Sequence, residues 1–476
     1  MSVFLAKLRE IAGEEHVITE ASQQSSFVID QRGRFQGKAL AVVLPNSSQQ
    51  ISEIVKLCAA HQVPIVSQGG NTGLVLASVP DQTGQAIIVS TRRMHAIREL
   101  DSANNTITVE AGCTLAQVQE AAKNQARFFP LSLASEGSCT IGGNLASNAG
   151  GTAVLRYGNM RELCLGLEVV LADGQIWHGL RGLRKDNTGY DLRDLFIGSE
   201  GTLGIITAAV LKLSPAPLQV HTAWLAVRSL DEVMAVFDFA RKQFDASLTG
   251  FELISAACLK LVAKHFPQYQ QPSVNLSTFP FTILLELSSA SQQNLSGAIV
   301  EEALSEIAQM HQLEQIFLAQ NQTQATEFWA IREAISPAQA KEGANIKHDI
   351  SLPISAITHF CKETEVMLQN YLADLQIICF GHIGDGNLHY NISTPFGLAS
   401  EDFSRQQAQV NRLVHDQVAK FHGSISAEHG IGMLKRDELQ RYKSPVELAL
   451  MRKIKLALDP DNLMNPGKIL HARGYT

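Results

Sequence analysis

Residues 39–68 show two patterns of apolar positions that follow one another. ALAVVLP (39–45) and VPIVSQ (63–68) are short apolar runs, which predict buried β-strands. Between them, residues 47–62 place apolar side chains three and four positions apart, and this spacing predicts an amphipathic helix. Ser47 or Ser48 is its expected N-cap, because a serine oxygen can accept a hydrogen bond from a first-turn amide. The pattern predicts a strand–helix–strand unit.

The next 120 or so residues continue this mixture of periods. IIVS (87–90) and ITVEAG (107–112) are strand-like, and residues 114–126 again have helical spacing. GLEVVLADGQIWHG (166–179) predicts a β-hairpin that turns at Asp173-Gly174, since Asp-Gly is a favoured hairpin turn.

After the Pro-Ala-Pro segment at 215–217 the pattern changes. Glycine becomes sparse, and helix-length patterns alternate with strand patterns such as FTILLELS (281–288) and IICFGHI (377–383). The prolines mark a domain boundary, because proline interrupts helices and sheet ladders alike. The last clear helical pattern is SPVELALMRKIKLAL (444–458). The second half therefore predicts a separate α+β domain.

Composition places the chain among folded globular proteins. Its 476 residues suit two to four domains, and 45% apolar against 18% charged residues is enough to form a core. The net charge is −7 and no run of Lys or Arg marks a phosphate-binding stripe, so nucleic acid is not an expected partner. The seven cysteines are scattered without a C-x-x-C pair, which is typical of buried thiols rather than of a disulfide framework or a cysteine zinc site.

No stretch of the sequence is predicted to enter a membrane. The N-terminal apolar positions are interrupted by Lys7 and Arg9, so we expect no signal-peptide core. No later run approaches the roughly 18 apolar residues that a membrane-spanning helix needs. We therefore expect a soluble, cytoplasmic protein with no transmembrane segment.

Three glycine-rich segments carry the first candidate chemistry: residues 67–74, 133–151 and 183–207. Glycine lets backbone N–H groups approach a ligand, and successive N–H groups form concavities that suit a pyrophosphate. Neither G-x-G-x-x-G nor the P-loop pattern occurs, so neither a Rossmann dinucleotide site nor a P-loop is indicated. Tight turns are the alternative explanation for these glycines, but three such clusters in one half of the chain favour a ligand.

The stretches QGGNTGL, IGGNLASNAGG, LRKDNTGYDL and GSEGTLGIIT resemble the flavin domain of the vanillyl-alcohol oxidase type. With the later motifs GHIGDGNLHYN and AEHGIG, the chain from about residue 40 onward resembles the FAD-dependent D-2-hydroxyacid dehydrogenases, in particular those that act on D-2-hydroxyglutarate. The resemblance implies an α+β fold. Its parts are a two-subdomain FAD-binding domain of the vanillyl-alcohol oxidase (PCMH) type at 1–217, an α+β substrate- and metal-binding domain at 218–430, and a small C-terminal helical segment at 431–476 that closes on the flavin domain.

The resemblance also implies the cofactor, non-covalently bound FAD. The loop 68–73 is expected to cradle the pyrophosphate, residues between 135 and 148 to line the pyrophosphate and the isoalloxazine, and the segment 201–206 to lie against the adenine side. The expected FAD-binding residues are Gln68, Gly69, Gly70, Asn71, Thr72, Gly73, Ser135, Gly137, Ser138, Gly142, Gly143, Asn148, Gly201, Ile206 and Asn465. No His or Cys that matches a covalent flavin link is identified.

CFGHIGDGNLHYNIS (379–393) predicts a second hairpin, with Gly-Asp-Gly-Asn at its turn. A two- or four-residue loop would place His382 directly opposite His389, with Cβ atoms about 5 Å apart on one face of the sheet. Asn391, two residues further along, would share that face. Two imidazoles at this spacing suit one metal ion; an inert pair of buried histidines is the alternative.

SAEHGIG follows the hairpin and places a carboxylate beside an imidazole. Neighbours on a strand point to opposite faces, so Glu428 and His429 can face one site only if the chain turns, which Gly430 allows. Two histidines and a carboxylate are a common catalytic Zn²⁺ set, which also fits Mn²⁺ or Fe²⁺. The family resemblance implies a divalent metal, with Zn²⁺ expected, and His429 as general base. The implied metal ligands are His382, His389 and Glu428.

Residues 325–336 are helical by spacing, so Arg332 and Ser336 share a helix face, and Pro337 is expected to end the helix at Ser336. Residues 345–354 alternate as a strand that carries Lys347. From the residues alone, Arg332 can equally pair with a glutamate of its own helix on a solvated face. The family resemblance implies instead that these cations bind substrate carboxylates. The implied substrate-binding residues are Arg332, Ser336, Lys347 and Asn391.

The implied reaction is oxidation of a D-2-hydroxy acid, namely D-2-hydroxyglutarate and also D-malate, to the 2-oxo acid. The metal would bind the substrate hydroxyl, His429 would take its proton, and a hydride would pass from C2 to flavin N5. The sequence has no haem or iron–sulfur motif, so we expect an external electron acceptor, either an electron-transfer flavoprotein or a quinone- or cytochrome-type acceptor. A D-lactate dehydrogenase of the same family, a metal-dependent hydrolase and a non-catalytic flavin-binding module are the alternatives, and a homodimer is left open.

Overall fold

The computed structural model describes residues 2–269, 271–291, 293–395 and 399–471. The chain forms two compact units, and each is discontinuous in sequence. The first unit comprises residues 1–150, 158–216 and 428–476, and the second comprises residues 151–157 and 217–427. The short segment 151–157 lies within the stretch assigned above to the FAD-binding domain but belongs to the second unit.

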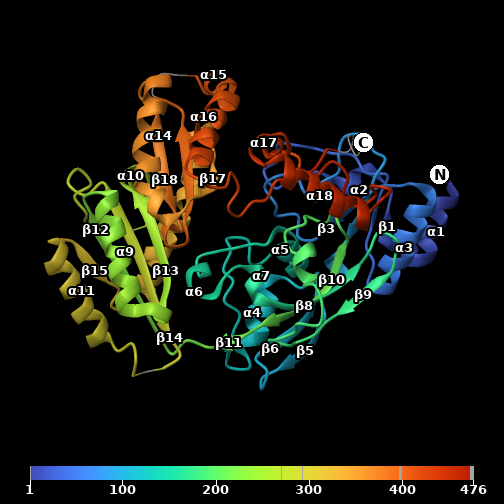
Figure 1. The fold of residues 1–476 in the computed structure, drawn as a ribbon, viewed down its shortest axis with the longest axis horizontal. Coiled ribbons are helices and arrows are strands. Elements are labelled where there is room, and N and C mark those ends of the chain that lie inside the picture. The colour runs from blue at the N-terminus through green and yellow to red at the C-terminus, as the bar shows by residue number, and fades with distance from the viewer. Residues whose placement is uncertain (1, 270, 292, 396–398, 472–476) are drawn as a thin grey trace. The chain divides into compact units, whose positions relative to one another are not determined.

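The first unit contains a small sheet of strand order β1-β2-β4-β3, in which β2, β3 and β4 are parallel and β1 is antiparallel (Figure 1). Strands β2 and β3 have the same direction, so the chain needs a crossover between them, which α3 (Ser48–His61) supplies. The predicted strand–helix–strand unit is confirmed, and its N-cap is Ser47, whose Oγ accepts from the Gln50 amide at 3.3 Å. The other elements are α1 (Ser2–Ala12), β1 (Val17–Ile18), α2 (Ala21–Val28), β2 (Ala41–Val43), β3 (Ile65–Gln68) and β4 (Ile87–Ser90).

A second sheet in the first unit is antiparallel throughout, with strand order β5-β6-β10-β8-β9. The predicted hairpin at 166–179 is confirmed as β8 and β9, and the Gly174 amide closes its turn by donating to Leu171 O at 2.9 Å. The helix predicted at 114–126 is α4, which begins with a capping box between Thr114 and Gln117. The strands of this sheet are β5 (Ile97–Asp101), β6 (Thr106–Glu110), β8 (Cys164–Val170), β9 (Ile176–Gly179) and β10 (Ile205–Lys212). Strands β7 (Arg127–Phe128) and β11 (Ser214–Pro215) pair with each other in a separate sheet. The helices of this part are α4 (Leu115–Lys123), α5 (Ile141–Ser147), α7 (Met160–Leu163) and α8 (Arg193–Phe196).

The C-terminal residues of the first unit cover the outer edge of β3. The Ile65 amide donates to Leu463 O at 2.8 Å, and the Asn465 amide donates to Ile65 O at 2.7 Å. A buried ion pair of Lys455 with Asp459 supports this tail, because Asp459 Oδ1 also accepts from the Leu463 amide at 2.9 Å. The helices are α17 (Arg436–Tyr442) and α18 (Pro445–Leu458), and the second confirms the helical pattern read at 444–458.

The second unit is built on an eight-stranded sheet of order β15-β12-β14-β13-β18-β19-β16, with β17 also pairing with β19 (Figure 1). All its pairs are antiparallel. The strands are β12 (Gln219–Val227), β13 (Leu248–Ser255), β14 (Phe281–Ser289), β15 (Ile316–Leu318), β16 (Asn345–Ile346), β17 (Asp349–Ser351), β18 (Gln376–Gly381) and β19 (Asn387–Ser393).

Helices cover both faces of this sheet. On one face Phe328 and Ile331 pack with Ile254 and Phe380 in a buried core under α10, α12 and α13. On the opposite face, α9 packs through the edge-to-face contact of Phe237 with a phenylalanine of β13. The helices are α6 (Val154–Tyr157), α9 (Leu230–Phe244), α10 (Ala256–His265), α11 (Gly297–His311), α12 (Gln322–Glu333), α13 (Ile335–Glu342), α14 (Ile357–Tyr371), α15 (Ser400–Arg405) and α16 (Gln407–Lys420).

Two elements predicted in this unit differ from the structure. The helix predicted to end at Ser336 stops earlier, at Glu333, and α13 begins after Ala334 with Pro337 in its first turn. Proline is tolerated there because first-turn amides have no acceptor within the helix. The strand predicted at 345–354 is also interrupted, since β16 and β17 are separated by residues 347–348.

Two further expectations concern the whole chain. Among the residues that the structure describes, no helix is both long and apolar enough to cross a membrane. All seven cysteines are buried and none is disulfide-bonded, which confirms the interpretation of their scattered spacing.

Candidate functional site

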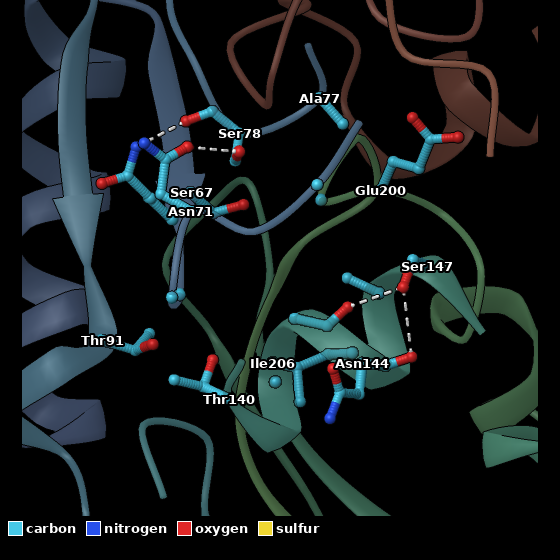
Figure 2. Close-up of a pocket in the computed structure, with 18 of the residues that line it drawn as sticks. Ser67, Asn71, Ala77, Ser78, Thr91, Thr140, Asn144, Ser147, Glu200 and Ile206 are labelled. Carbon is cyan, nitrogen blue, oxygen red and sulfur yellow. Dashed lines mark hydrogen bonds between the residues drawn. The ribbon is translucent and has the colours of Figure 1, made fainter. Parts of the chain in front are cut away.

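A pocket in the first unit is lined by the loop after β3, by α5 and by the residues around Glu200 (Figure 2). About 900 Å³ of space in and around it is not filled by atoms, part of it open to solvent. His429 also lines it. The glycine-rich segments that the sequence analysis singled out therefore meet at one cavity.

The structure places most of the predicted FAD-binding residues in this pocket. Those that line it are Gln68, Gly69, Gly70, Asn71, Thr72, Gly73, Gly142, Gly143, Gly201 and Ile206. Those that do not are Ser135, Gly137, Ser138, Asn148 and Asn465. Sequence reasoning missed other lining residues, of which Figure 2 labels Ser67, Ala77, Ser78, Thr91, Thr140, Asn144, Ser147 and Glu200.

The polar side chains of the loop after β3 hold the loop rather than face outward. Gln68 Nε2 donates to Phe27 O at 2.8 Å and to Ser78 O at 2.7 Å. Asn71 Nδ2 donates to Ile29 O at 2.9 Å, while its Oδ1 accepts from Ser78 Oγ at 2.9 Å. These bonds fix the backbone of the loop. They give the amide side chains of Gln68 and Asn71 a structural role, and the predicted contact of these residues with FAD stays a prediction.

The backbone of this loop has hydrogen-bond donors available for a ligand. Within the described part of the chain, no hydrogen bond to another protein group uses the N–H groups of residues 69–73. Successive amides of this kind form a site for an anion such as a pyrophosphate. The donor set therefore fits the phosphates of FAD.

Two kinds of glycine line the pocket. A Cβ on Gly70 would collide with the carbonyl of Ser138, so this glycine is required by the protein's own packing. A Cβ on Gly143 would come no nearer than 3.5 Å to a protein atom, and one on Gly73 no nearer than 3.9 Å. Side chains at these two positions would have room only in the pocket, which is the behaviour expected of glycines that leave space for a cofactor.

We expect Gly143→Leu to weaken FAD binding at least about tenfold, because the new side chain would occupy the pocket. Titration of flavin-free protein with FAD, followed by quenching of flavin fluorescence, measures this. Gly297→Leu is the matched control, since a side chain there comes no nearer than 4.0 Å to its nearest neighbour and this glycine of the second unit does not line the pocket. Equal FAD affinity in both variants would show that Gly143 does not border the cofactor.

In the second unit, the histidine hairpin has a different register from the predicted one. Phe380, not His382, pairs with His389. The strand ends at Gly381, and His382 O accepts from the Asp385 amide at 3.1 Å, so the chain closes a wider turn than the predicted loops allow. The prediction that His382 stands directly opposite His389 is therefore wrong. The two rings still approach each other, with centroids 6.2 Å apart and planes at 71°.

The side-chain amide of Asn391 is already bound by neighbouring protein groups. Its Oδ1 accepts from the His348 amide at 3.0 Å, and its Nδ2 donates to Gln339 Oε1 at 2.9 Å. The residue is 3% exposed. In this structure Asn391 connects β19 to α13, and its role in substrate binding stays a prediction.

Glu252 on β13 stands between two predicted site residues. It contacts His382 Nδ1 through Oε1 and accepts from Arg332 Nε through Oε2 at 2.7 Å. Burial raises the pKa of Glu252, but His382 and Arg332 outweigh this effect and lower it to about 2. Arg332 thus pairs with Glu252, not with a glutamate of its own helix. Glu252 was not among the residues predicted from the sequence, although a charged residue in the apolar run TGFELIS is a signal of a buried, paired charge.

The other predicted substrate residues have different surroundings. Lys347 lies opposite Asn391, because the pairing Ile346 with Ile392 continues to Asp349 with His389 in one register. Lys347 itself lies in the break between β16 and β17, and its role in substrate binding stays a prediction. Ser336 is exposed in the first turn of α13.

The segment that carries Glu428 and His429 leaves the second unit and enters the first. Ala427, the last residue of the second unit, donates its amide to Asp349 O at 3.3 Å, and Asp349 pairs with His389. Glu428 follows Ala427 by one peptide bond. As predicted, the chain turns at Gly430, whose φ is +81°.

Glu200, a residue of the first unit, holds the turn that follows His429. Its two carboxylate oxygens accept from the amides of Ile431 and Gly432, both at 2.7 Å. Burial raises the pKa of Glu200, and the two amide donors partly offset that effect. His429 is therefore on a turn that is held by two charge-assisted hydrogen bonds at the rim of the pocket.

Comparison with known proteins agrees with this architecture. The model described as "FAD linked oxidases, C-terminal domain" matches residues 216–469, and the one described as "FAD binding domain" matches residues 39–179. A probable mitochondrial D-2-hydroxyglutarate dehydrogenase of Oryza sativa subsp. indica is 37% identical over 97% of this chain and 80% of its own length. The D-2-hydroxyglutarate dehydrogenase of Stutzerimonas stutzeri (strain A1501) is 35% identical over 98% of both chains.

Solved structures show the same fold at low sequence identity. p-Cresol methylhydroxylase is 18% identical, with a TM-score of 0.75 over 99% of this chain and 97% of its own. 4-Ethylphenol oxidase from Gulosibacter chungangensis is 16% identical, with a TM-score of 0.72 over 98% of this chain and 96% of its own. The chain has the fold of the vanillyl-alcohol oxidase type; it belongs to the FAD-dependent D-2-hydroxyacid dehydrogenase family and is an FAD-dependent oxidoreductase.

Proposed function

We propose that this protein oxidises a dicarboxylic D-2-hydroxy acid, D-2-hydroxyglutarate first and D-malate second, to the 2-oxo acid. The observation that carries the proposal is the group formed by Arg332, Glu252 and His382, with His389 on the same sheet face. It combines a carboxylate-binding side chain with two imidazoles in one buried region. The names of the relatives support the same substrate.

The donor set near the hairpin fits a divalent metal, with Zn²⁺ the expected ion. The rings of His382 and His389 approach each other. Glu428 directly follows Ala427, whose amide donates to Asp349 O on β17. Two imidazoles and one carboxylate leave coordination positions for a substrate, as in catalytic zinc sites. We assign His382, His389 and Glu428 as the ligands.

The protein's own groups have distinct tasks in this scheme. Arg332 binds a substrate carboxylate through its terminal nitrogens, and Lys347 binds the distal carboxylate. His429 takes the proton of the substrate hydroxyl as general base, since it lines the FAD pocket. When bound, the metal supplies positive charge that makes the alcohol more acidic, and FAD accepts its electron pair. The sequence carries no haem or iron–sulfur motif, so the electrons then pass to an external acceptor.

Anaerobic mixing of the holoenzyme with D- and L-hydroxy acids, followed by flavin absorbance, tests the function. We expect D-2-hydroxyglutarate to bleach the flavin fastest, D-malate more slowly, and the L-enantiomers not at all. Faster bleaching by D-lactate than by either dicarboxylate would assign the protein to D-lactate instead. An unchanged flavin spectrum with every acid would overturn the proposed activity.

Lys347→Met provides the residue-level arm of the same experiment. Loss of one charge-assisted hydrogen bond is worth about 1.5–3 kcal/mol, so kcat/KM for D-2-hydroxyglutarate should fall roughly ten- to hundredfold. D-lactate, which has no distal carboxylate, should be little affected. Lys362→Met is the matched control, because this exposed lysine of α14 pairs with Asp231 at 2.9 Å. Equal losses for both substrates would mean that Lys347 does not hold the distal carboxylate.

A further inference from the structure

The buried carboxylate of Glu252 contacts two predicted site residues, His382 and Arg332, with one oxygen each. Glu252 Oε1 contacts Nδ1 of His382, and Glu252 Oε2 accepts from Nε of Arg332 at 2.7 Å. Its side chain is 0% exposed. A buried carboxylate is stable only when it is paired and hydrogen-bonded, so the two partners and the acid depend on one another.

The contact with His382 decides which ring nitrogen faces away from Glu252. A carboxylate beside Nδ1 favours the tautomer with the proton on Nδ1, which leaves the lone pair on Nε2. Histidines that bind metals commonly use such an arrangement, in which a carboxylate fixes the ring and increases its basicity. His382 is therefore oriented as an Nε2 ligand.

The contact with Arg332 decides which edge of the guanidinium faces a ligand. Glu252 holds the Nε side, and the group also stacks over the Phe380 ring at 4.9 Å from the centroid. Among the described residues, no protein hydrogen bond uses the terminal nitrogens Nη1 and Nη2 of Arg332. These two nitrogens are the pair that binds a carboxylate in bidentate fashion.

We propose that Glu252 is a positioning residue that couples the two halves of substrate recognition: it orients His382 for the metal through one oxygen and Arg332 for a substrate carboxylate through the other. This inference rests on the proposed function. It predicts that one substitution changes metal binding and carboxylate binding together, although Glu252 itself would touch neither ligand.

The chain offers a matched control in Glu286 on the next strand. Glu286 is opposite Gly250 in the β13–β14 pairing, so it shares the sheet face of Glu252. It accepts from Trp329 Nε1 at 2.8 Å, and burial raises its pKa. Glu286 is an acid on the same sheet face, but it bonds to Trp329 rather than to the predicted metal ligand His382 or to Arg332.

The test uses full-length, FAD-loaded, metal-free protein with Glu252→Gln, Glu252→Ala or Glu286→Gln. Zn²⁺ alone is titrated by calorimetry and Co²⁺ alone by its visible absorption. Glu252→Gln should weaken metal binding about 10- to 100-fold, because its amide nitrogen beside Nδ1 favours the other tautomer. Glu286→Gln should bind both ions as the wild type does, and the flavin spectrum should stay unchanged in all variants.

The second arm titrates 2-oxoglutarate alone into the same metal-free proteins. Glu252→Gln still offers an oxygen to Arg332 and should bind the dicarboxylate nearly as the wild type does, whereas Glu252→Ala should bind it about tenfold or more weakly. If Glu252→Ala does not fold, the isosteric Gln variant still gives the metal result. Metal affinity in Glu252→Gln equal to that of Glu286→Gln would overturn the coupling role. A wild type that binds neither Zn²⁺ nor Co²⁺ would instead overturn the proposed metal dependence.

Discussion

His429→Asn is expected to lower the rate of flavin reduction by D-2-hydroxyglutarate about 10²- to 10⁴-fold, the usual contribution of a general base. His429 lines the FAD pocket, and the turn that follows it is held by the carboxylate of Glu200. Asparagine keeps a polar side chain of similar reach but cannot take a proton. Stopped-flow measurement of flavin bleaching under anaerobic conditions separates this step from reoxidation.

The pH profile distinguishes a base from a structural residue. In the wild type, flavin reduction should slow as the pH falls and the base becomes protonated, and this dependence should vanish in His429→Asn. His95→Asn, at an exposed histidine of the first unit, should leave both rate and profile unchanged. Near-normal reduction combined with a loss of bound metal would reassign His429 as a metal ligand.

Removal of the metal with a chelator should abolish turnover while FAD stays bound. The FAD pocket belongs to the first unit, and the histidine pair belongs to the second, so loss of the ion leaves the cofactor's contacts intact. The charge of a metal ion is worth several kcal/mol to the reaction, which corresponds to a drop of about 10³-fold or more. Activity before and after addition of EDTA, and after addition of Zn²⁺ or Mn²⁺, measures the effect.

His389→Ala should reproduce the loss and resist rescue by added metal, since one ligand of the set is gone. His359→Ala is the control, because this exposed histidine of α14 lies outside the hairpin. The bound FAD is quantified after heat release in every sample. Full activity of metal-stripped protein would end the proposed metal role, and loss of FAD on chelation would show that the ion is structural.

Local sequence patterns predicted local structure well. The helix after Ser47 and the hairpin turn at Gly174 depend on residues within a few positions of each other, and both are present as predicted. The hairpin with His382 was harder, because its register depends on which amides close the turn on His382 O. That choice follows from the turn's backbone conformation, which the one-letter pattern of glycines does not specify.

The contacts within the candidate site could not be predicted from the sequence for a different reason. Glu252 is 130 residues from His382 and 80 from Arg332 in the sequence, so no local pattern connects them. The family resemblance supplied His382 and Arg332 as candidates, but the acid between them emerged only from the pairing of β13 with β18. Likewise, Gln68 and Asn71 belong to the expected motif, but the distant backbone carbonyls that their side chains bind, Phe27 O and Ile29 O, could not be read from it.

The coverage of β3 by the C-terminal tail sets the order in which the protein can be completed during synthesis. The amide of Ile65 bonds to Leu463 O, so the edge of an early strand is paired only after a segment far along the chain has been made. Asn465 next bonds through Nδ2 to Ala77 O at 2.9 Å and to Glu200 O at 2.7 Å, which ties two pocket loops together. The loops around the FAD pocket therefore gain these contacts only after the whole stretch 217–427 of the second unit has been synthesised.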